Sequence, residues 1–380
     1  MAPSGYEKTS PLGVPLYTFG FAKTFSFSIL NDFSYPLKTG CLKTEVFKQP
    51  LFLRVDFMII PIFIPHEGCR NECTYCNQRS ISGSVKPPTI YEAEQLINEY
   101  LASADGHGQQ IAFFGGSFTG IEIEKQNEYL ALAKKYISSG NIESIRLSTR
   151  PDYIDEDCVK RLCEFGVKNI ELGAQSLDSE VLLKANRGHS VHDVEKASEI
   201  ILRHNITLGL QMMTGLRGDT NEKCLHTARK IFELGSGETR IYPTIVLKNT
   251  TLEKEFQNGE YKAQSIEEAV NISAMLYAYF VKHNIKVLRI GLPYSENLEK
   301  NYVAGPQHPS LGELVISRVF RNEIESLMGS CKNVEIFAPK RLISKINGNR
   351  KCNILYFKNK KINISVTVVD SWTHMMVNVY

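Results

Sequence analysis

The sequence predicts an α/β fold: a parallel sheet curved into a partial, TIM-like (β/α)6 barrel, followed by a small basic α+β appendage. Two observations favour this fold. Short apolar runs alternate with amphipathic stretches from Met58 to about residue 300, and the alternation stops after that point. Such alternation is typical of parallel sheets with helices outside. Six strand–helix units are too few to close an eight-stranded barrel, so an open barrel is expected.

The six units are expected in order along the chain. Thr89 and Ser190 are suitable N-terminal caps for two of the helices, and Gly166 is typical of a helix end. In a barrel or an open sheet of this kind, ligands bind at the C-terminal ends of the strands. The expected strands are 58–65, 110–114, 144–148, 169–172, 207–212 and 239–242, and the expected helices are 91–103, 125–138, 155–165, 191–204, 220–234 and 265–283.

Residues 58–300 form the barrel in this prediction, and two segments lie outside it. Residues 1–57 show no motif and no clear helical or strand period, so we expect a poorly structured N-terminal extension and a functional protein that begins near Met58. Deletion of residues 2–57 should then leave activity intact. Residues 301–380 are expected to form the appendage, with a helix at 309–327 and strands at 333–337, 353–357 and 362–369.

The composition is ordinary for a globular protein, with 43% hydrophobic and 22% charged residues. No run of about 18 uncharged apolar residues occurs, so no membrane span is expected. The net charge of +3 is unevenly divided. Residues 331–380 carry nine Lys or Arg against only Glu335 and Asp370, a balance of +7 that leaves −4 for the rest. This segment is compatible with an RNA or DNA backbone contact and equally with a solvated basic face.

Three cysteines, Cys69, Cys73 and Cys76, have the spacing C-x3-C-x2-C and can converge on one metal site. A [4Fe–4S] cluster usually takes four cysteines, but the next one along the chain is Cys158. Three ligands leave one iron open to bind a small molecule and pass an electron to it. A structural zinc site with His66 as the fourth ligand is the alternative. The cysteine count of nine is odd and six are scattered, so we expect no disulfides and a reducing, cytoplasmic location.

Polar and glycine-rich motifs stand at the ends of the expected strands. Gly115 and Gly116 follow the second strand, where their backbone can approach a ligand closely. Arg150 ends the third strand and can pair bidentately with a carboxylate, although a surface salt bridge is an equal alternative. Gln175 follows the fourth strand and Gln211 ends the fifth. Their shared position makes all of these residues candidates for one site.

The cysteine spacing, with Tyr75 just before the last cysteine, resembles the radical S-adenosylmethionine (SAM) superfamily. More narrowly, the chain resembles the radical SAM part of the Elongator catalytic-subunit family over about residues 58–320. The runs that carry this resemblance are Pro65-His66-x2-Cys69, Phe114 to Gly120 (FGGSFTG), Thr149 to Tyr153 (TRPDY), Glu171 to Ser176 (ELGAQS) and Ile241 to Thr244 (IYPT).

The resemblance implies a radical SAM type of barrel and a role for each matching residue. The three cysteines would hold a [4Fe–4S] cluster, and the amino and carboxylate groups of SAM would chelate its open iron. The implied SAM contacts are Tyr75 near the adenine, Gly115 and Gly116 at the methionine amino group, Ser117 in place of the more usual acidic residue, Arg150 at the carboxylate, Gln175 near the ribose, and Gln211 as a further contact.

The resemblance also implies an activity. An electron from a reductant such as ferredoxin or flavodoxin would split SAM into methionine and a 5′-deoxyadenosyl radical, which abstracts a substrate hydrogen. The family modifies the wobble uridine of tRNA, so RNA is the expected substrate and tRNA a possible partner. About 60 residues follow the resembling region, too few for the acetyltransferase domain of larger members, so a short form without that domain is expected. Radical chemistry on a small metabolite and a non-catalytic zinc-binding module are the alternatives.

Overall fold

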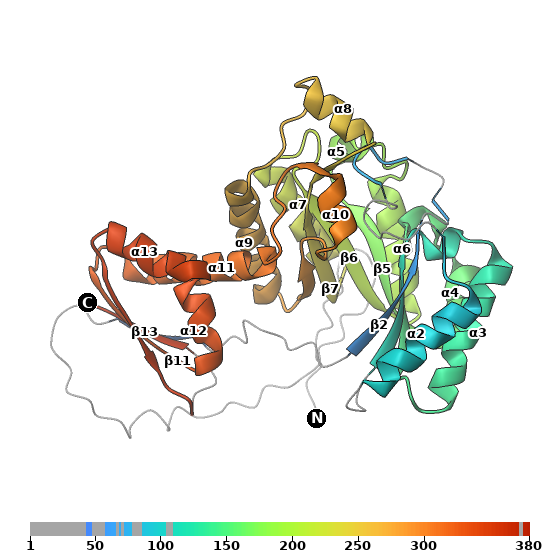
Figure 1. Ribbon diagram of the computed structural model, residues 1–380, viewed down its shortest axis with the longest axis horizontal. Helices are drawn as coiled ribbons and strands as arrows, with labels where there is room; N and C mark the ends of the chain where they lie inside the picture. The colour runs from blue at the N-terminus through green and yellow to red at the C-terminus, as the bar shows by residue number, and fades with distance from the viewer. Residues whose placement is uncertain are drawn as a thin grey trace, which may run out of the picture. The chain divides into compact units, whose positions relative to one another are not determined.

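The structure is a computed structural model, and it describes residues 43–47, 58–65, 68–69, 72–77, 86–103, 109–371 and 375–380. Its largest element is a parallel sheet of seven strands whose spatial order follows the chain (Figure 1). The α/β partial barrel is confirmed, with seven strands in place of the expected six. The strands are β2 Met58–Ile64, β3 Gln109–Gly115, β4 Ser144–Thr149, β5 Val167–Gln175, β6 Thr207–Thr214, β7 Glu238–Pro243 and β9 Lys286–Ile290.

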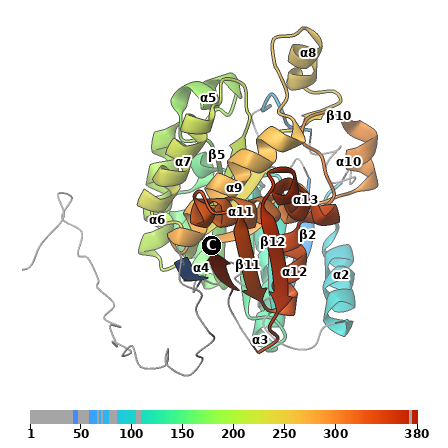
Figure 2. The same cartoon turned by 90° about the vertical axis from the view of Figure 1, so that its left-hand side faces the viewer.

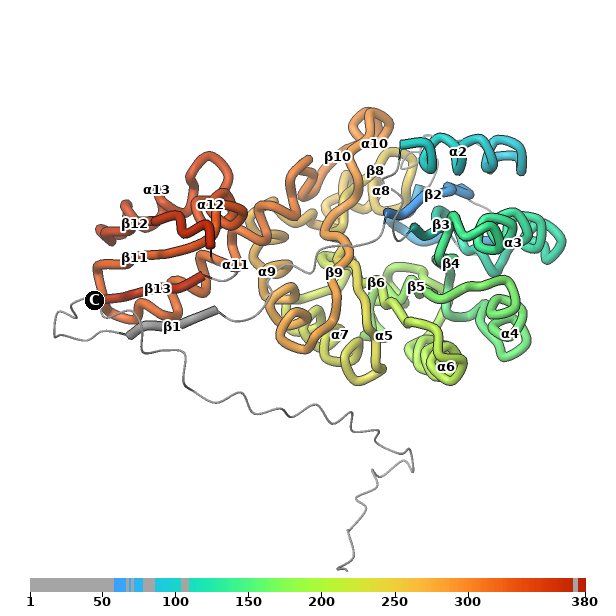
Figure 3. The backbone as a smooth tube through the Cα atoms, turned by 90° about the horizontal axis from the view of Figure 1, so that it is seen from below, coloured from blue at the N-terminus to red at the C-terminus, as the bar shows by residue number. Residues whose placement is uncertain are grey.

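Helices connect the strands and lie outside the arc that the strands form (Figure 3). The predicted caps are confirmed: Thr89 and Ser190 each form a capping box, and Gly166 follows α4 with a φ of +93°. The connecting helices are α2 Ile90–Ala102, α3 Ile123–Ser138, α4 Glu156–Glu164, α6 Val191–Arg203, α7 Asn221–Glu233 and α9 Ile266–Lys282.

The two faces of the sheet differ in chemistry. Successive side chains of a strand point to opposite faces. Ile145 and Leu147 of β4 lie in the apolar core shared with the outer helices, whereas Arg146 between them bonds to residues of other strands on the inner face. β5 repeats the pattern, with Ile170 and Leu172 in the core and Glu171 on the inner face. The interior of the partial barrel is therefore polar and charged.

β9 is the strand that the sequence pattern does not predict. Among the described strands it lies at the edge of the sheet and pairs with β7 alone. Its residues are half-buried or exposed, so it does not need an uninterrupted apolar run. Several other elements are too short for their periodicity to be read. They are α5 Ser179–Lys184, β8 Val246–Leu247, α8 Thr251–Gln257, α10 Glu296–Asn301 and β10 Tyr302–Ala304, and β10 pairs antiparallel with β8.

The C-terminal segment forms a second sheet beside three helices (Figure 2). Its strand order is β1–β13–β11–β12, and Arg318 of α11 joins it to the barrel helices through two hydrogen bonds to Glu267 of α9 (2.8 and 2.9 Å). Among the described helices, none has the length and apolar character to span a bilayer. The elements are β1 Lys43–Phe47, β11 Asn333–Ala338, β12 Asn363–Val368, β13 Met375–Val379, α11 Leu311–Met328, α12 Lys340–Asn347 and α13 Cys352–Asn359.

Two predictions for the flanking segments are wrong. The strand expected at 353–357 is the helix α13, because the buried Asn353 side chain donates to the Ser317 and Ile346 carbonyls and Phe357, one turn later, is buried beside it. The unstructured extension contains the strand β1, whose partner β13 lies more than 300 residues away in sequence. The rest of residues 1–57 lies outside the described part of the chain.

Candidate active site

The cysteine loop after β2 packs against the glycine-rich loop after β3. Gly68 has a φ of +77°, and a Cβ on it would lie 2.1 Å from the Ser117 carbonyl oxygen. A Cβ on Gly120 would lie 2.3 Å from the Gly68 carbonyl oxygen. Only glycine allows two backbones to approach this closely. The contact leaves the Cys69 Sγ 3.5 Å from the Ser117 Oγ.

Hydrogen bonds hold the cysteine loop from two further sides. The Thr74 N–H donates to the Ala185 carbonyl after α5 (3.1 Å), and the Leu252 N–H at the start of α8 donates to the Thr74 carbonyl (2.8 Å). The short elements that the sequence pattern does not predict therefore fix this loop. Two side-chain amides add further bonds, from Asn186 to the Glu72 carbonyl (2.8 Å) and from Asn77 to the Lys248 carbonyl (3.1 Å).

The three cysteines all lie on this loop at the C-terminal end of the sheet. Cys69 is exposed, Cys73 and Cys76 are half-buried, and none of the eight described cysteines forms a disulfide. Among the described residues, no three His, Cys, Asp or Glu side chains are arranged to hold a single metal ion. His66, the candidate fourth zinc ligand, lies outside the described part of the chain.

Arg187 stands beside the cysteines, although no sequence pattern points to it. Its Nη1–H donates to the Cys73 Sγ (3.1 Å) and its Nη2–H donates to the Gly173 carbonyl (2.7 Å). The Tyr75 side chain packs against Leu216 of the loop after β6, and burial raises the pKa of its hydroxyl well above the usual value. One guanidinium thus connects the cysteine loop to the end of β5.

Arg150 forms the salt bridge considered for it, with the exposed Asp152, although the Arg150 side chain is itself buried. Its Nε and Nη2 donate to the two carboxylate oxygens of Asp152 (2.9 and 3.0 Å), which leaves the buried Nη1 with no partner among the described residues. Gln175 ends β5 with a φ of +65°, and its buried Oε1 likewise has no partner there. A ligand at this position would satisfy both groups, whose isolation costs about 1–3 kcal/mol each.

His189 is a second residue of this site that the sequence does not reveal. It is 6% exposed. Burial, together with the charges of Arg187 and Arg150, lowers the pKa of His189 to about 3, so its ring is neutral at physiological pH. The run Asn186-Arg187-Gly188-His189 follows α5, and only the three-dimensional fold brings it to the cysteines.

The glycine pair lies at the end of the strand β3 and packs against the end of β2. Gly115 has a φ of +118°, and a Cβ on it would lie 2.6 Å from the Ile64 carbonyl oxygen. The same carbonyl accepts the Gly116 N–H (2.9 Å). The N–H of Gly116 is therefore already hydrogen-bonded within the protein. A larger residue at Gly115 would push the backbone at the end of β3 away from the end of β2.

Gln211 is held by a different group of residues. Its side-chain amide donates to the Ser148 Oγ (3.2 Å) and to the Glu171 carboxylate (2.9 Å). Glu171 belongs to a buried set of charged groups on the inner face, together with Arg146, Glu238 and Arg240. The sequence signal for this set is a charged residue between two apolar ones within a strand, as in Ile145-Arg146-Leu147.

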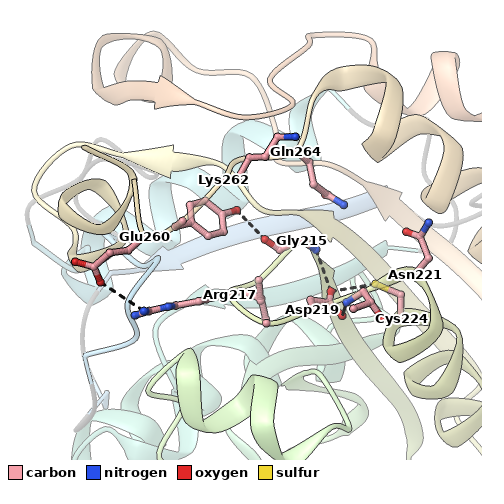
Figure 4. Close-up of a pocket in the computed structure, with 12 residues that line it drawn as sticks. Gly215, Arg217, Asp219, Asn221, Cys224, Glu260, Lys262 and Gln264 are labelled. Atoms are coloured by element: carbon pink, nitrogen blue, oxygen red, sulfur yellow. Dashed lines mark hydrogen bonds and ion pairs between the residues drawn. The ribbon is translucent and has the colours of Figure 1, made fainter. Parts of the chain in front are cut away.

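A polar pocket of about 240 Å³ lies at the end of β6 (Figure 4). It is bordered by the loop 215–220, the start of α7 and the segment 260–264. Asp219 organises the loop by accepting the Gly215 N–H (2.9 Å) and the Cys224 thiol (3.0 Å), and burial raises the pKa of its carboxyl. None of the residues predicted for the site lines this pocket.

Comparisons with known proteins agree with this geometry. Residues 63–231 match the family model of the Radical SAM superfamily, and residues 238–321 match that of the Radical_SAM C-terminal domain. The chain is similar to a tRNA uridine(34) acetyltransferase from Methanocaldococcus jannaschii, with 25% identity over 65% of this chain and 49% of that protein. It is also similar to Elongator complex protein 3 from Saccharomyces cerevisiae, with 29% identity over 44% of this chain and 34% of that protein.

The fold is similar to that of a solved structure, the archaeal Methanocaldococcus infernus Elp3 with residues 1–46 deleted. The TM-score is 0.57 and the identity 22%, over 70% of this chain and 63% of that one, which supports the fold alone. The chain spans about half the length of the first curated relatives it matches. The two family models match in order along residues 63–321, and the first covers the cysteine loop, the glycine-rich loop and every other residue of this site. This chain therefore belongs to the radical SAM superfamily, as its resemblance to the Elongator catalytic subunit suggests.

Proposed function

We propose that this radical SAM enzyme modifies a uridine of RNA, with tRNA as its partner. The observation that carries the proposal is its likeness to proteins named for tRNA uridine(34), over about two thirds of the chain. Acetyl transfer, which those names include, is not part of the proposal.

The residues of the site fit the two cofactors that the superfamily implies. Cys69, Cys73 and Cys76 are three thiols on one anchored loop, and they would hold the [4Fe–4S] cluster. Within the described residues the buried Nη1 of Arg150 has no partner and fits a carboxylate, and the Oε1 of Gln175 has none and fits a hydroxyl donor. SAM has both groups. When bound and supplied with one electron by a reductant, the two cofactors would provide radical chemistry that removes a hydrogen atom from the substrate.

The chain's own residues orient these groups and protect the site. Arg187 places a positive charge against Cys73 and fixes the end of β5 through the Gly173 carbonyl. Gly115 and Gly116 bring the backbone at the end of β3 against Ile64 at the end of β2, and Tyr75 anchors the cysteine loop against the apolar cluster that contains Leu216. Ser117 stands where an acidic residue is more usual, so its hydroxyl near Cys69 takes that place without a charge.

The basic C-terminal segment supports an RNA partner. Arg350, Lys351, Lys358 and Lys361 are exposed around α13. The Tyr356 ring nearby lies within 4.3 Å of the Arg321 guanidinium and within 4.5 Å of the Lys360 ammonium. Exposed basic groups gathered around one helix suit the phosphate backbone of an RNA.

The salt dependence of tRNA binding tests this surface. Replacement of those four exposed residues by Ala should lower the slope of log affinity against log salt by about 0.7 to 0.9 for each phosphate that the protein no longer neutralises. Ala at four exposed lysines of the barrel, Lys160, Lys168, Lys196 and Lys282, is the matched control and should leave the slope unchanged. Equal slopes for both sets would argue that RNA does not use this surface.

The modification itself is tested in cells. Mass spectrometry of bulk RNA nucleosides from a strain without the protein should show the loss of one modified uridine, restored by the wild-type chain but not by Cys73→Ala. An unchanged nucleoside profile, together with SAM cleavage by the purified enzyme, would instead favour a small metabolite as substrate. We further propose a flavodoxin or ferredoxin as reductant and a reducing compartment such as the cytoplasm, in keeping with the described cysteines, none of which forms a disulfide.

A further inference from the structure

The polar interior of the barrel contains a set of charged side chains whose bonds can be followed atom by atom. Arg146 joins two carboxylates, with Nη1 at 3.0 Å from a Glu171 oxygen and at 2.6 Å from a Glu238 oxygen. Arg240 binds Glu171 bidentately, with Nε and Nη2 at 2.6 and 2.9 Å from its two oxygens. The Phe114 ring covers Arg240, 5.0 Å from the guanidinium carbon. The two positive and two negative charges balance.

Every acceptor position of Glu171 is used. One carboxylate oxygen accepts from Arg146 and Arg240, and the other accepts from Arg240 and from the amide nitrogen of Gln211. Glu171 is 1% exposed, yet the neighbouring arginines hold the pKa of its carboxyl below the usual value despite that burial. Glu171 is thus ionised at neutral pH, and an ionised carboxylate only accepts hydrogen bonds.

This property determines which way the amide of Gln211 faces. The nitrogen and oxygen of a side-chain amide have nearly the same shape, so a glutamine is oriented by its partners. The end of Gln211 beside Glu171 must be the NH2 group, because a carbonyl there would place one acceptor against an ionised carboxylate oxygen that can only accept. The second N–H is occupied by Ser148. The carbonyl Oε1 is left on the opposite side of a half-buried side chain and accepts no hydrogen bond from the described residues.

We infer that Glu171 is a positioning residue that orients Gln211, so that the barrel interior presents one fixed hydrogen-bond acceptor to a nucleoside ligand. The ligand group is an N–H or O–H donor, which the base N–H of a uridine and the ribose hydroxyl of S-adenosylhomocysteine can each supply. The inference rests on the proposed function for the identity of these ligands, but the orientation of the amide does not depend on it.

The carboxylate of Glu171 and the amide of Gln211 can be exchanged by mutation. Glu171→Gln places an amide next to Gln211, whose carbonyl can then turn inward and leave its NH2 facing the ligand. Combining Glu171→Gln with Gln211→Glu returns an acceptor to the interior and restores the charge balance with Arg146 and Arg240. The single substitution should weaken binding of the recognised ligand about tenfold, and the double substitution should restore it to within about threefold.

The orientation is measured without any ligand by hydrogen exchange of the Gln211 side-chain amide in an NMR spectrum. Its two N–H groups should exchange at least about tenfold more slowly than those of the exposed Gln95, and Glu171→Gln should remove this protection. Equal exchange at Gln211 and Gln95 would overturn the inference, whatever the enzyme binds. This measurement separates its failure from failure of the proposed function.

Calorimetric titration with S-adenosylhomocysteine and with uridine monophosphate then identifies the donor. The probe whose affinity falls in Glu171→Gln and returns in the double variant is the one that Gln211 contacts. Glu267→Gln is the control. It removes a carboxylate of the outer helix α9 that is paired with Arg318 of α11. Gln211→Met removes the acceptor without disturbing the charges and serves if Glu171→Gln does not fold. Unchanged affinity of both probes in the folded variants would overturn the inference.

Discussion

The close contact between Gly68 and the glycine-rich loop can be tested with one methyl group. In Gly68→Ala the new Cβ would lie 2.1 Å from the Ser117 carbonyl oxygen and 2.8 Å from the Gly120 carbonyl carbon. Both are backbone atoms, so relief requires the two loops to separate by about 1 Å. Alanine also costs about 1 kcal/mol at the positive φ of Gly68. We expect the protein to fold but its cysteine loop to be displaced.

The structure offers a control with the same backbone conformation. Gly259 has a φ of +76°, and a Cβ on it would meet nothing within 4 Å. Gly259→Ala therefore carries the conformational cost without the clash, and the two variants should have similar melting temperatures by circular dichroism. Only Gly68→Ala should lose cluster affinity, by about tenfold or more, as expected when the support of a metal ligand is removed. Iron and sulfide content after anaerobic reconstitution measures this loss, and equal content in the two variants would refute the reasoning.

Three further predictions concern the ligands, the buried charges and pH. Cys73→Ala should abolish both the visible absorption of the reconstituted protein and its cleavage of SAM. A colourless wild-type protein that holds one zinc ion would contradict the assignment as an enzyme. Arg240→Met should lower the free energy of unfolding in urea by about 3–5 kcal/mol, because it leaves the buried Glu171 with one partner fewer. Lys184→Met, which removes an exposed ion pair, should lower it by less than about 1 kcal/mol. The pKa of His189 is about 3 in the folded protein, against an ordinary value of 6.5. As the pH falls below 6.5, the histidine gains a proton in the unfolded chain but not in the folded one, so the free energy of unfolding should fall. The loss should reach about 2 kcal/mol near pH 5 and be absent in His189→Gln, and parallel pH curves would contradict it.

Local signals in the sequence were sufficient for most of the barrel. Each main strand is an apolar run that a helix must cover, and the capping boxes at Thr89 and Ser190 mark where two helices begin. The strand β9 escaped prediction because an edge strand with Lys286 and Arg289 buries little. The helix α13 was mistaken for a strand because Ile354, Leu355 and Tyr356 suit either structure, and only the buried bonds of Asn353 decide between them.

The site was predictable only where residue type is itself the signal. The cysteine spacing and the glycine pair can be read from the chain because few other uses explain them. Arg187 and His189 could not be found in this way, since an arginine or histidine after a short helix has no period and no partner nearby in sequence. Arg187 matters through its hydrogen bond to Cys73, 114 residues away along the chain, and His189 through the charge of Arg150, 39 residues away. Such contacts exist only once the parallel strands are aligned.

The charged interior explains why the site sits at one end of the sheet and not at its centre. A partial barrel needs its inner face filled, and apolar side chains would leave no way to orient a polar ligand. Arg146, Glu171, Glu238 and Arg240 fill the centre with groups that satisfy one another, as their mutual bonds of 2.6 to 3.2 Å indicate. Among the described residues, Arg150 just after β4 and Gln175 at the end of β5 each keep a buried polar atom without a partner. A ligand gains hydrogen bonds at Arg150, at Gln175 and at the free carbonyl of Gln211, but not at the four charges that already satisfy one another, so the network favours binding at the end of the sheet. Removing any one of its four charges should therefore weaken selectivity for the site at that end as well as stability.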